Sequence, residues 1–223
     1  MIELSAISMR YGEQTVLHIP DLRFEEGKRY ALIGVNGSGK TTLLRILAGM
    51  IAPTTGEVRN VPRRHMGYMP QSPYAFGFSV RKNVEIALPN KTDAPEKALR
   101  ALAAVGIQHL AKSSGSRLSG GETQRMAFAR IIALPRRLLL LDEPTSSTDI
   151  QGLDQIEQSL LAYAQSTGCT VIFSTHSPAQ ALRLSDQIIF LDHGEIAEFG
   201  ATASVLKNPQ NATTRLFLQH WKI

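Results

Sequence analysis

Residues 28–42 read KRYALIGVNGSGKTT, and they decide how the fold around them is built. An apolar strand pattern at 28–33 runs directly into a glycine-rich loop at 34–41. The next segment, 41–49, predicts a helix, and one of its faces would carry Leu43, Ile46, Leu47 and Met50. The loop fits G-x-x-x-x-G-K-[ST], in which backbone N–H groups and a helix N-terminus bind phosphate. Because strand, loop and helix follow in the required order, an ordinary glycine-rich turn is a poor alternative. The loop by itself predicts a phosphate-binding protein and nothing narrower.

Two side chains of this loop have distinct expected roles. Lys40 would reach the β- and γ-phosphates of a nucleoside triphosphate, and the hydroxyl of Thr41 would ligand Mg²⁺. The other positions would line the phosphates, with the glycines allowing main-chain N–H groups to point inward. These other positions are Gly34, Asn36, Gly37, Ser38, Gly39 and Thr42.

The composition is ordinary for a globular protein. The chain has 223 residues, of which 43% are apolar and 19% charged, and no apolar run approaches the roughly 20 residues that cross a bilayer. Residues 1–10 alternate apolar and polar side chains, so we expect no signal peptide. The single cysteine, Cys169, excludes an internal disulfide. The net charge of +5 comes from scattered Lys and Arg, which favours a solvated surface over nucleic-acid binding.

Strand and helix patterns predict an α/β fold. Strands are expected at 2–8, 16–24, 28–33, 137–142 and 170–175, an amphipathic crossover helix around 153–161, and a hairpin at 187–199 that turns at His193–Gly194. The apolar runs at 137–142 and 170–175 are typical of parallel strands buried on both faces. We therefore predict one domain over residues 1–223. Its P-loop NTPase core (1–71 and 136–223) would have a mostly parallel sheet and an antiparallel β front subdomain, with an inserted helical subdomain at 72–135.

A pair of carboxylates follows one of these strands. Residues 137–144 read RLLLLDEP, so an apolar strand carries Asp142 to the carboxyl edge of the sheet, where α/β proteins bind ligands. Asp142 would hold Mg²⁺, generally through water, and Glu143 would polarise the attacking water. Two carboxylates that only cap a strand end are a weak alternative downstream of a complete phosphate loop. The two segments together predict an ATPase that uses ATP and Mg²⁺.

The segment 118–125 reads LSGGETQR and begins an apolar-periodic helix. Two glycines at a helix N-terminus form a second anion site. One chain has a single γ-phosphate to bind, so a second site makes sense if it serves a neighbouring chain. The segment closely resembles the signature of the ATP-binding cassette (ABC) transporter family, and the resemblance covers nearly the whole chain. It implies an importer-like ATPase subunit that works as a homodimer beneath transmembrane permease subunits on other chains.

The resemblance assigns roles to residues outside the three motifs. Tyr11 matches the aromatic residue that stacks on adenine. Gln71 matches the glutamine that contacts both Mg²⁺ and the membrane partner, and His176 matches the switch histidine at the γ-phosphate. The signature residues that would contact the ATP of the other subunit are Ser119, Gly120 and Gly121. One departure is Thr148, which stands where the family usually has an apolar packing residue, and we expect it to affect the tightness of coupling across the dimer.

Several alternatives remain open at this point. Asn90-Lys91-Thr92-Asp93 mimics a guanine-specificity motif, but the motif order does not fit a GTPase. An ABC exporter, an ABC ATPase without a transporter and a module that no longer hydrolyses ATP are further alternatives. The segment 207–218 is similar to importer ATPases for oxyanions and polar amino acids. We therefore expect a small-anion importer of the tungstate, molybdate or phosphate type. A substrate-binding protein would be a further partner, and the ATPase would be peripheral on the cytoplasmic face of the membrane.

Overall fold

The computed structural model describes residues 2–221. Contacts within the chain define two compact units. The first consists of the residues up to 66, of 137–142 and of the residues from 168 onward, and the second of 67–136 and 143–167. Each unit is described by itself below.

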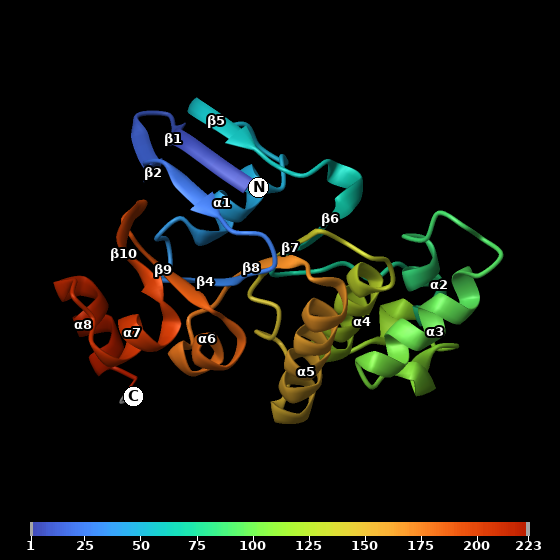
Figure 1. Ribbon diagram of the computed structural model, residues 1–223. Helices are drawn as coiled ribbons and strands as arrows, with labels where there is room; N and C mark the ends of the chain where they lie inside the picture. The colour runs from blue at the N-terminus through green and yellow to red at the C-terminus, as the bar shows by residue number, and fades with distance from the viewer. Residues whose placement is uncertain (1, 222–223) are drawn as a thin grey trace. The chain divides into compact units, whose positions relative to one another are not determined.

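A mostly parallel sheet forms the centre of the first unit (Figure 1). Its strands are β4 (Arg29–Ile33), β7 (Leu138–Asp142), β8 (Thr170–Ser174), β9 (Gln187–Asp192) and β10 (Glu195–Ala201), in the order β10-β9-β4-β8-β7. The neighbours β7/β8, β8/β4 and β4/β9 are parallel, and β9/β10 is an antiparallel hairpin. All residues of β7 and β8 are buried, as their apolar sequences predict. The mostly parallel α/β sheet and the hairpin are therefore confirmed.

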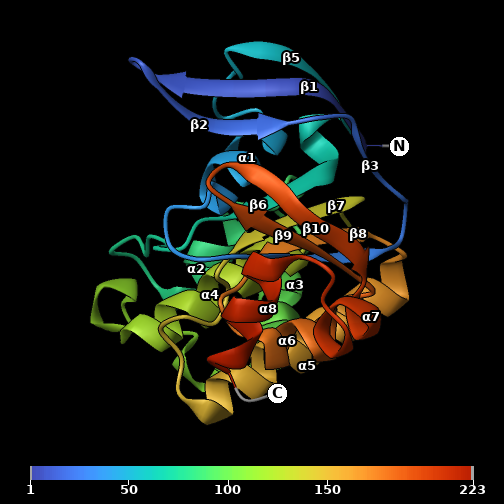
Figure 2. The ribbon, with the colours of Figure 1, turned by 90° about the vertical axis from the view of Figure 1, so that its left-hand side faces the viewer.

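A second sheet in this unit is antiparallel and confirms the predicted β front (Figure 2). It contains β1 (Ile2–Tyr11), β2 (Gln14–Ile19), β3 (Leu22–Phe24) and β5 (Thr55–Arg59), and the long β1 pairs with each of the other three. The prediction of one strand over 16–24 is wrong. Pro20 has no N–H to donate to a ladder, and the chain breaks there into β2 and β3.

Helices cover both faces of the mostly parallel sheet. Helix α1 (Lys40–Leu47) packs on β7 and β8, while α6 (Pro178–Leu184) lies on the opposite side against β4 (Figure 1). Two more helices, α7 (Thr202–Lys207) and α8 (Ala212–Gln219), pack on the hairpin. The prediction that Met50 shares a helix face with Leu43, Ile46 and Leu47 is wrong, because α1 ends at Leu47 and Met50 is 60% exposed.

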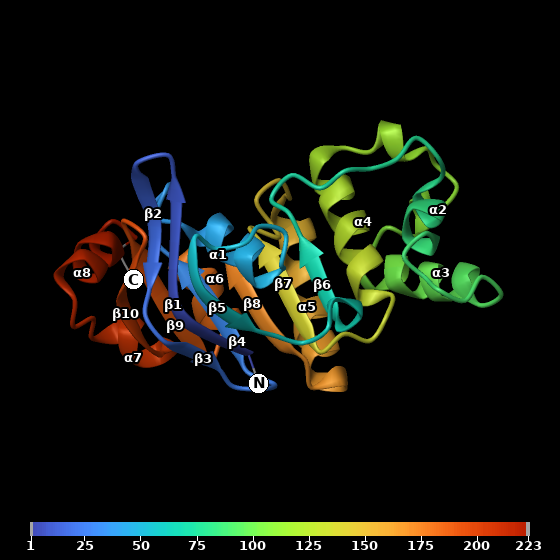
Figure 3. The ribbon, with the colours of Figure 1, turned by 90° about the horizontal axis from the view of Figure 1, so that it is seen from above.

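The second unit is mostly helical, as predicted for 72–135. Its helices are α2 (Val80–Glu85), α3 (Ala94–Ala104), α4 (Gly120–Ile132) and α5 (Ile150–Thr167), and β6 (Met66–Met69) lies where the chain enters it. Helices α2, α3 and α4 lie side by side in Figure 3, and α5 packs on α4. The division of the chain at 72 and 135 into core and subdomain stays a prediction. Among residues 2–221, no helix is both long and apolar enough to cross a membrane.

Candidate functional site

The phosphate loop connects β4 to α1 in the first unit and is shaped by glycine. A Cβ atom at Gly34 would lie 2.1 Å from the carbonyl oxygen of Leu191, so a side chain at this position cannot be accommodated. Lys40 is 7% exposed, and its Nζ donates hydrogen bonds to the carbonyl oxygens of Gly34 (2.8 Å) and Val35 (2.9 Å). The loop therefore brings its ammonium and its main chain together, as binding of a phosphate chain requires.

The first turn of α1 has the features of an anion site. Gly39 is its N-cap residue and supplies no side-chain hydrogen bond, and the turn contains no acidic residue. The first N–H groups of a helix have no partner within the helix, and the helix dipole places partial positive charge there. In the context of a glycine-shaped loop that begins at Gly34, this helix end suits phosphate oxygens.

Asp142 ends β7 and has a carboxylate that is bound by two hydroxyl groups. Its Oδ1 accepts hydrogen bonds from Thr41 Oγ1 (3.1 Å) and from Ser174 Oγ (2.7 Å), and the residue is 2% exposed. Carboxylate and hydroxyl oxygens are hard ligands, and Mg²⁺ typically binds one or two carboxylates together with substrate phosphates and water. Thr41 and Asp142 therefore fit the predicted metal site. Ser174 was not predicted, although it directly precedes Thr175 and His176 in the sequence.

The other two predicted residues of the first unit have exposed side chains. Tyr11 is the last residue of β1, pairs with Gln14 and is 52% exposed. His176 follows the end of β8, and its ring lies 6.0 Å, centroid to centroid, from the indole of Trp221. Both side chains are therefore accessible to a ligand, and Trp221 is a neighbour that the sequence did not predict.

In the second unit, Glu143 and Gln71 are hydrogen-bonded to each other. Nε2 of Gln71 donates to Oε2 of Glu143 at 3.2 Å. The backbone of Glu143 has φ of 44°, a left-handed conformation that is rare outside glycine and that clusters at functional sites. The structure therefore joins two residues that are 72 positions apart in the sequence and that were predicted to serve the same reaction.

Gln124 holds the chain around Glu143 in place. Its buried amide donates to the carbonyl oxygen of Glu143 (2.9 Å) and to Ser146 Oγ (3.2 Å), and it accepts from the N–H of Ser147 (2.8 Å). The amide thus fixes the loop that follows β7. Gln124 lies within the signature segment 118–125, but its role could not be predicted from the sequence, because its partners lie about twenty residues further on.

The signature segment begins α4 with a capping box. Ser119 Oγ accepts from the N–H of Glu122 (3.2 Å), and a carboxylate oxygen of Glu122 accepts from the N–H of Ser119 (2.7 Å). That backbone N–H of Ser119 is the main cause that lowers the pKa of Glu122 below its usual value. The segment is therefore held rigidly at the helix N-terminus, where an anion would bind.

Gly120 and Gly121 lie against the loop that contains Thr148. A Cβ atom at Gly121 would stand 3.0 Å from the carbonyl oxygen of Ser147 and 3.2 Å from Cα of Thr148. The hydroxyl of Thr148 donates to the carbonyl oxygen of Thr145 at 2.8 Å. The polar residue at position 148 therefore satisfies its hydrogen-bonding group within its own loop.

The segment that mimics a guanine-specificity motif leads into α3. Asn90 Oδ1 accepts from the N–H of Thr92 at 3.1 Å, and Asp93 forms an ion pair with Lys97 at 2.6 Å. These groups shape a turn and stabilise the first turns of the helix. The structure thus gives the motif a local structural role.

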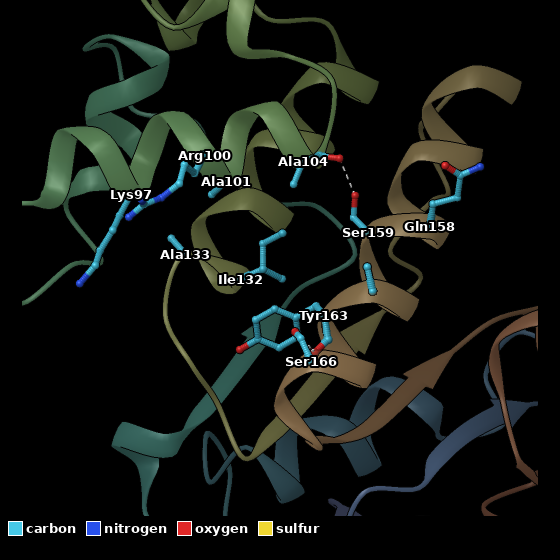
Figure 4. Close-up of a pocket in the computed structure, with 11 residues that line it drawn as sticks. Lys97, Arg100, Ala101, Ala104, Ile132, Ala133, Gln158, Ser159, Tyr163 and Ser166 are labelled. Carbon is cyan, nitrogen blue, oxygen red and sulfur yellow. Dashed lines mark hydrogen bonds between the residues drawn. The ribbon is translucent and has the colours of Figure 1, made fainter.

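A cavity of about 720 Å³ lies among α3, α4 and α5 (Figure 4). Lys97, Arg100, Ile132 and Tyr163 are among its lining residues, and Ser159 Oγ at its wall donates to the carbonyl oxygen of Ala104 at 2.6 Å. None of the predicted site residues lines this cavity. The candidate nucleotide site is therefore defined by the motif residues and not by this hollow.

Comparison with known proteins decides the family. Residues 17–146, more than half of the chain, match the family model described as ABC transporter. The chain belongs to the ABC transporter family. The matched range contains the phosphate loop, the signature and both carboxylates of this ABC protein. The predicted family and the predicted ATPase class are therefore confirmed.

The relatives of this ABC protein include ATP-binding proteins of several uptake systems. It is 36% identical over 207 residues to the tungstate uptake system ATP-binding protein TupC of Peptoclostridium acidaminophilum, covering 88% of this chain and 97% of that protein. It is 34% identical to the phosphate import ATP-binding protein PstB 2 of Natronomonas pharaonis, covering 97% and 86%. It is 33% identical to the spermidine/putrescine import ATP-binding protein PotA of Haemophilus influenzae, covering 98% of this chain but 62% of that protein.

Solved structures agree with the fold of this ABC protein. A dimeric ATP-binding cassette in a post-hydrolysis state, bound to ADP and Pi, has a TM-score of 0.81 and 27% sequence identity. The match covers 91% of this chain and 99% of that one. A second structure, the ATP-binding subunit of an ABC transporter, has a TM-score of 0.85 at 20% identity, which supports the fold alone. The α/β architecture is therefore that of an ABC ATPase.

Proposed function

We propose that this chain is the ATP-hydrolysing subunit of an ABC importer whose membrane-spanning permease subunits are separate chains. The observation that carries the proposal is the hydrogen bond that Thr41 Oγ1, at the start of α1, donates to Oδ1 of Asp142 (3.1 Å). It links Asp142, the first residue of the carboxylate pair, to the phosphate loop through oxygen ligands that suit Mg²⁺. The import ATPases among its relatives support the direction of transport.

Each site residue has a role in the proposed reaction. Lys40 binds the β- and γ-phosphates, while Thr41 and Asp142 hold the cation. A bound Mg²⁺ supplies charge that neutralises the developing negative charge on the phosphate oxygens. Glu143 takes a proton from the attacking water, and Gln71, hydrogen-bonded to it at 3.2 Å, orients its carboxylate and contacts the cation.

The remaining residues bind other parts of the nucleotide. The exposed ring of Tyr11 stacks on adenine. His176 contacts the γ-phosphate. The other loop positions, Gly34, Asn36, Gly37, Ser38, Gly39 and Thr42, line the phosphates.

The signature serves the ATP held by a second copy of the chain. Ser119, Gly120 and Gly121 stand at the N-terminus of α4, whose dipole and N–H groups favour an anion. A single chain has one phosphate loop, so the second anion site would bind the γ-phosphate of the ATP that the partner copy holds. The related cassette bound to ADP and Pi is dimeric, which supports this arrangement. We propose a homodimer with two composite sites.

The permease docks on an aromatic patch of the second unit, formed by Tyr74, Phe76 and Phe78. These side chains are 69%, 40% and 42% exposed, and their rings contact one another at 5.1 and 5.2 Å. Arg130 stabilises the patch through two contacts. Its guanidinium donates to the carbonyl oxygen of Tyr74 (3.2 Å) and makes a cation–π contact with the ring of Phe76. The patch begins three residues after Gln71 in the sequence. A permease bound to the patch would therefore contact the same short segment that contains a residue of the proposed reaction.

We propose a small oxyanion of the tungstate, molybdate or phosphate type as the transported substrate. The tungstate and phosphate proteins among the relatives support this class. The spermidine/putrescine protein among them makes a polyamine the alternative substrate. The test is ATPase activity of the complex with its permease in liposomes, measured with the cognate binding protein and tungstate, phosphate or spermidine. Stimulation by spermidine alone would contradict the oxyanion assignment and leave the ATPase assignment standing.

A further inference from the structure

His176 has an aromatic neighbour from the far end of the described chain. The ring of Trp221 lies 6.0 Å from the ring of His176, with 39° between the planes. Trp221 continues the last turn of α8, where its N–H donates to the carbonyl oxygen of Leu218 at 3.0 Å. The contact therefore joins the segment after α8 to the segment after β8, about 45 residues apart in the sequence.

Trp221 is anchored to the sheet through a row of rings. Its ring lies 6.3 Å from that of Phe217, and Phe217 packs edge-on at 5.2 Å against Phe190 of β9. Phe190 is 1% exposed, and its main chain is in register with Ile33, the last residue before the phosphate loop. The row Phe190, Phe217, Trp221 and His176 thus begins in the buried core and ends at an exposed side chain.

Polar contacts fix α8 in the place that this row needs. Asn211 caps the helix by accepting from the N–H of Thr213 at 2.8 Å. The carboxylate of Glu198, in β10, accepts from the N–H groups of Gln210 (2.9 Å) and Asn211 (3.2 Å). Helix α8 is thereby tied to the hairpin at its N-terminus as well as through its rings, so the indole of Trp221 has a defined position.

We propose that Trp221 is a positioning residue for His176. The inference rests on the proposed contact of His176 with the γ-phosphate. An exposed histidine has several rotamers, and only some of them aim the imidazole at a given phosphate. A fixed indole of Trp221 on one side of the His176 imidazole blocks some of these rotamers by steric clash. In the remaining rotamers the two rings are in contact, which stabilises them. The free energy of such a contact corresponds to about a 2–10-fold preference for the rotamers that keep it.

The first test measures ATP hydrolysis by Trp221→Ala and Trp221→Phe in the full chain. We expect Trp221→Ala to lower kcat about 2–10-fold with little change in the KM for ATP, because the imidazole is misdirected and not removed. Trp221→Phe keeps a ring at this position and should recover most of the rate. Adding Trp221→Ala to a His176→Ala chain should cost nothing more, since no imidazole is left to position.

The second test uses emission from Trp221, which is the only tryptophan of the chain. We expect His176→Ala to change the emission of the nucleotide-free protein, since an adjacent imidazole alters indole emission. The matched control is His220→Ala, because His220 precedes Trp221 in sequence but is not its ring partner; it should change the emission less. This test does not depend on whether the Trp221 variants fold.

The outcomes separate the inference from the proposed function. If His176→Ala hydrolyses ATP at the normal rate, the proposed role of His176 is wrong. If His176→Ala loses most of its rate but Trp221→Ala has the normal rate, the positioning role is wrong and the proposed function stands. Emission that is unchanged by His176→Ala would overturn the contact itself. A rate loss that Trp221→Phe does not recover, or that persists in the His176→Ala chain, would assign Trp221 a merely structural role.

Discussion

Ser174→Ala removes a hydroxyl that donates to Oδ1 of Asp142 at 2.7 Å, at a place where both residues are buried. A hydrogen bond to a charged group contributes about 1.5–3 kcal/mol to stability. Since a domain of this size loses about 2–4 °C in Tm for each kcal/mol, we expect a fall of about 3–12 °C. Asp142 is also the proposed cation ligand, and loss of a residue that orients a ligand typically weakens metal binding about 10–100-fold. The Mg²⁺ concentration for half-maximal ATPase activity should rise accordingly.

The matched control for this change is Ser159→Ala. Ser159 is 8% exposed and donates at 2.6 Å to the neutral carbonyl oxygen of Ala104, in the wall of a cavity that none of the predicted site residues lines. A neutral hydrogen bond contributes only about 0.5–1.5 kcal/mol, so the Tm should fall less and the Mg²⁺ requirement should stay unchanged. Thermal unfolding and Mg²⁺ titrations of ATPase activity measure both quantities. Equal losses of stability together with equal Mg²⁺ requirements in the two variants would refute the reasoning about Asp142.

Three further predictions concern other parts of the site. Tyr11→Ala should weaken ATP binding about 5–150-fold, from about 1–3 kcal/mol of stacking, while Tyr11→Phe should bind normally; equal affinities by calorimetry would remove the adenine role. Glu122 has a lowered pKa in the folded chain, so its stabilising contribution is present above the ordinary value of 4.5 and is lost as the pH falls through its folded pKa. The difference in Tm between wild type and Glu122→Gln should therefore shrink on acidification, and a difference that grows would contradict the capping role. Mixing the inactive Lys40→Ala and Ser119→Arg proteins should yield dimers with one intact composite site and some trapped nucleotide; trapping on the Lys40→Ala chain would reject composite sites.

The sequence predicted those features that depend on local order. The phosphate loop after β4, the buried strands β7 and β8 and the start of α4 each follow from a short local pattern, whereas the capping box of α4 was seen only in the structure. The errors have local causes as well. Pro20 divides one expected strand into two, and α1 ends before Met50 can continue its apolar face.

The contacts that long-range packing decides were not predictable. Ser174 reaches Asp142 only because β7 and β8 are neighbours in register, and no spacing in the sequence shows this. Gln124 reaches the carbonyl oxygen of Glu143 from another element of the second unit. A side chain that supports a motif residue through space leaves no periodic signal. The motif residues were therefore recognised, and their supporting residues were not.

The central claim is that Glu143 activates the water that hydrolyses ATP. The most direct measurement compares ATP binding and single-turnover hydrolysis by wild type and Glu143→Gln. Gln keeps the size of the side chain but cannot accept the proton, so binding of ATP with Mg²⁺ should be normal and the rate about 10²–10⁴-fold lower. The variant should also accumulate as an ATP-bound dimer in size-exclusion chromatography. Hydrolysis by Glu143→Gln at the wild-type rate, in protein freed of contaminating ATPases, would contradict the account.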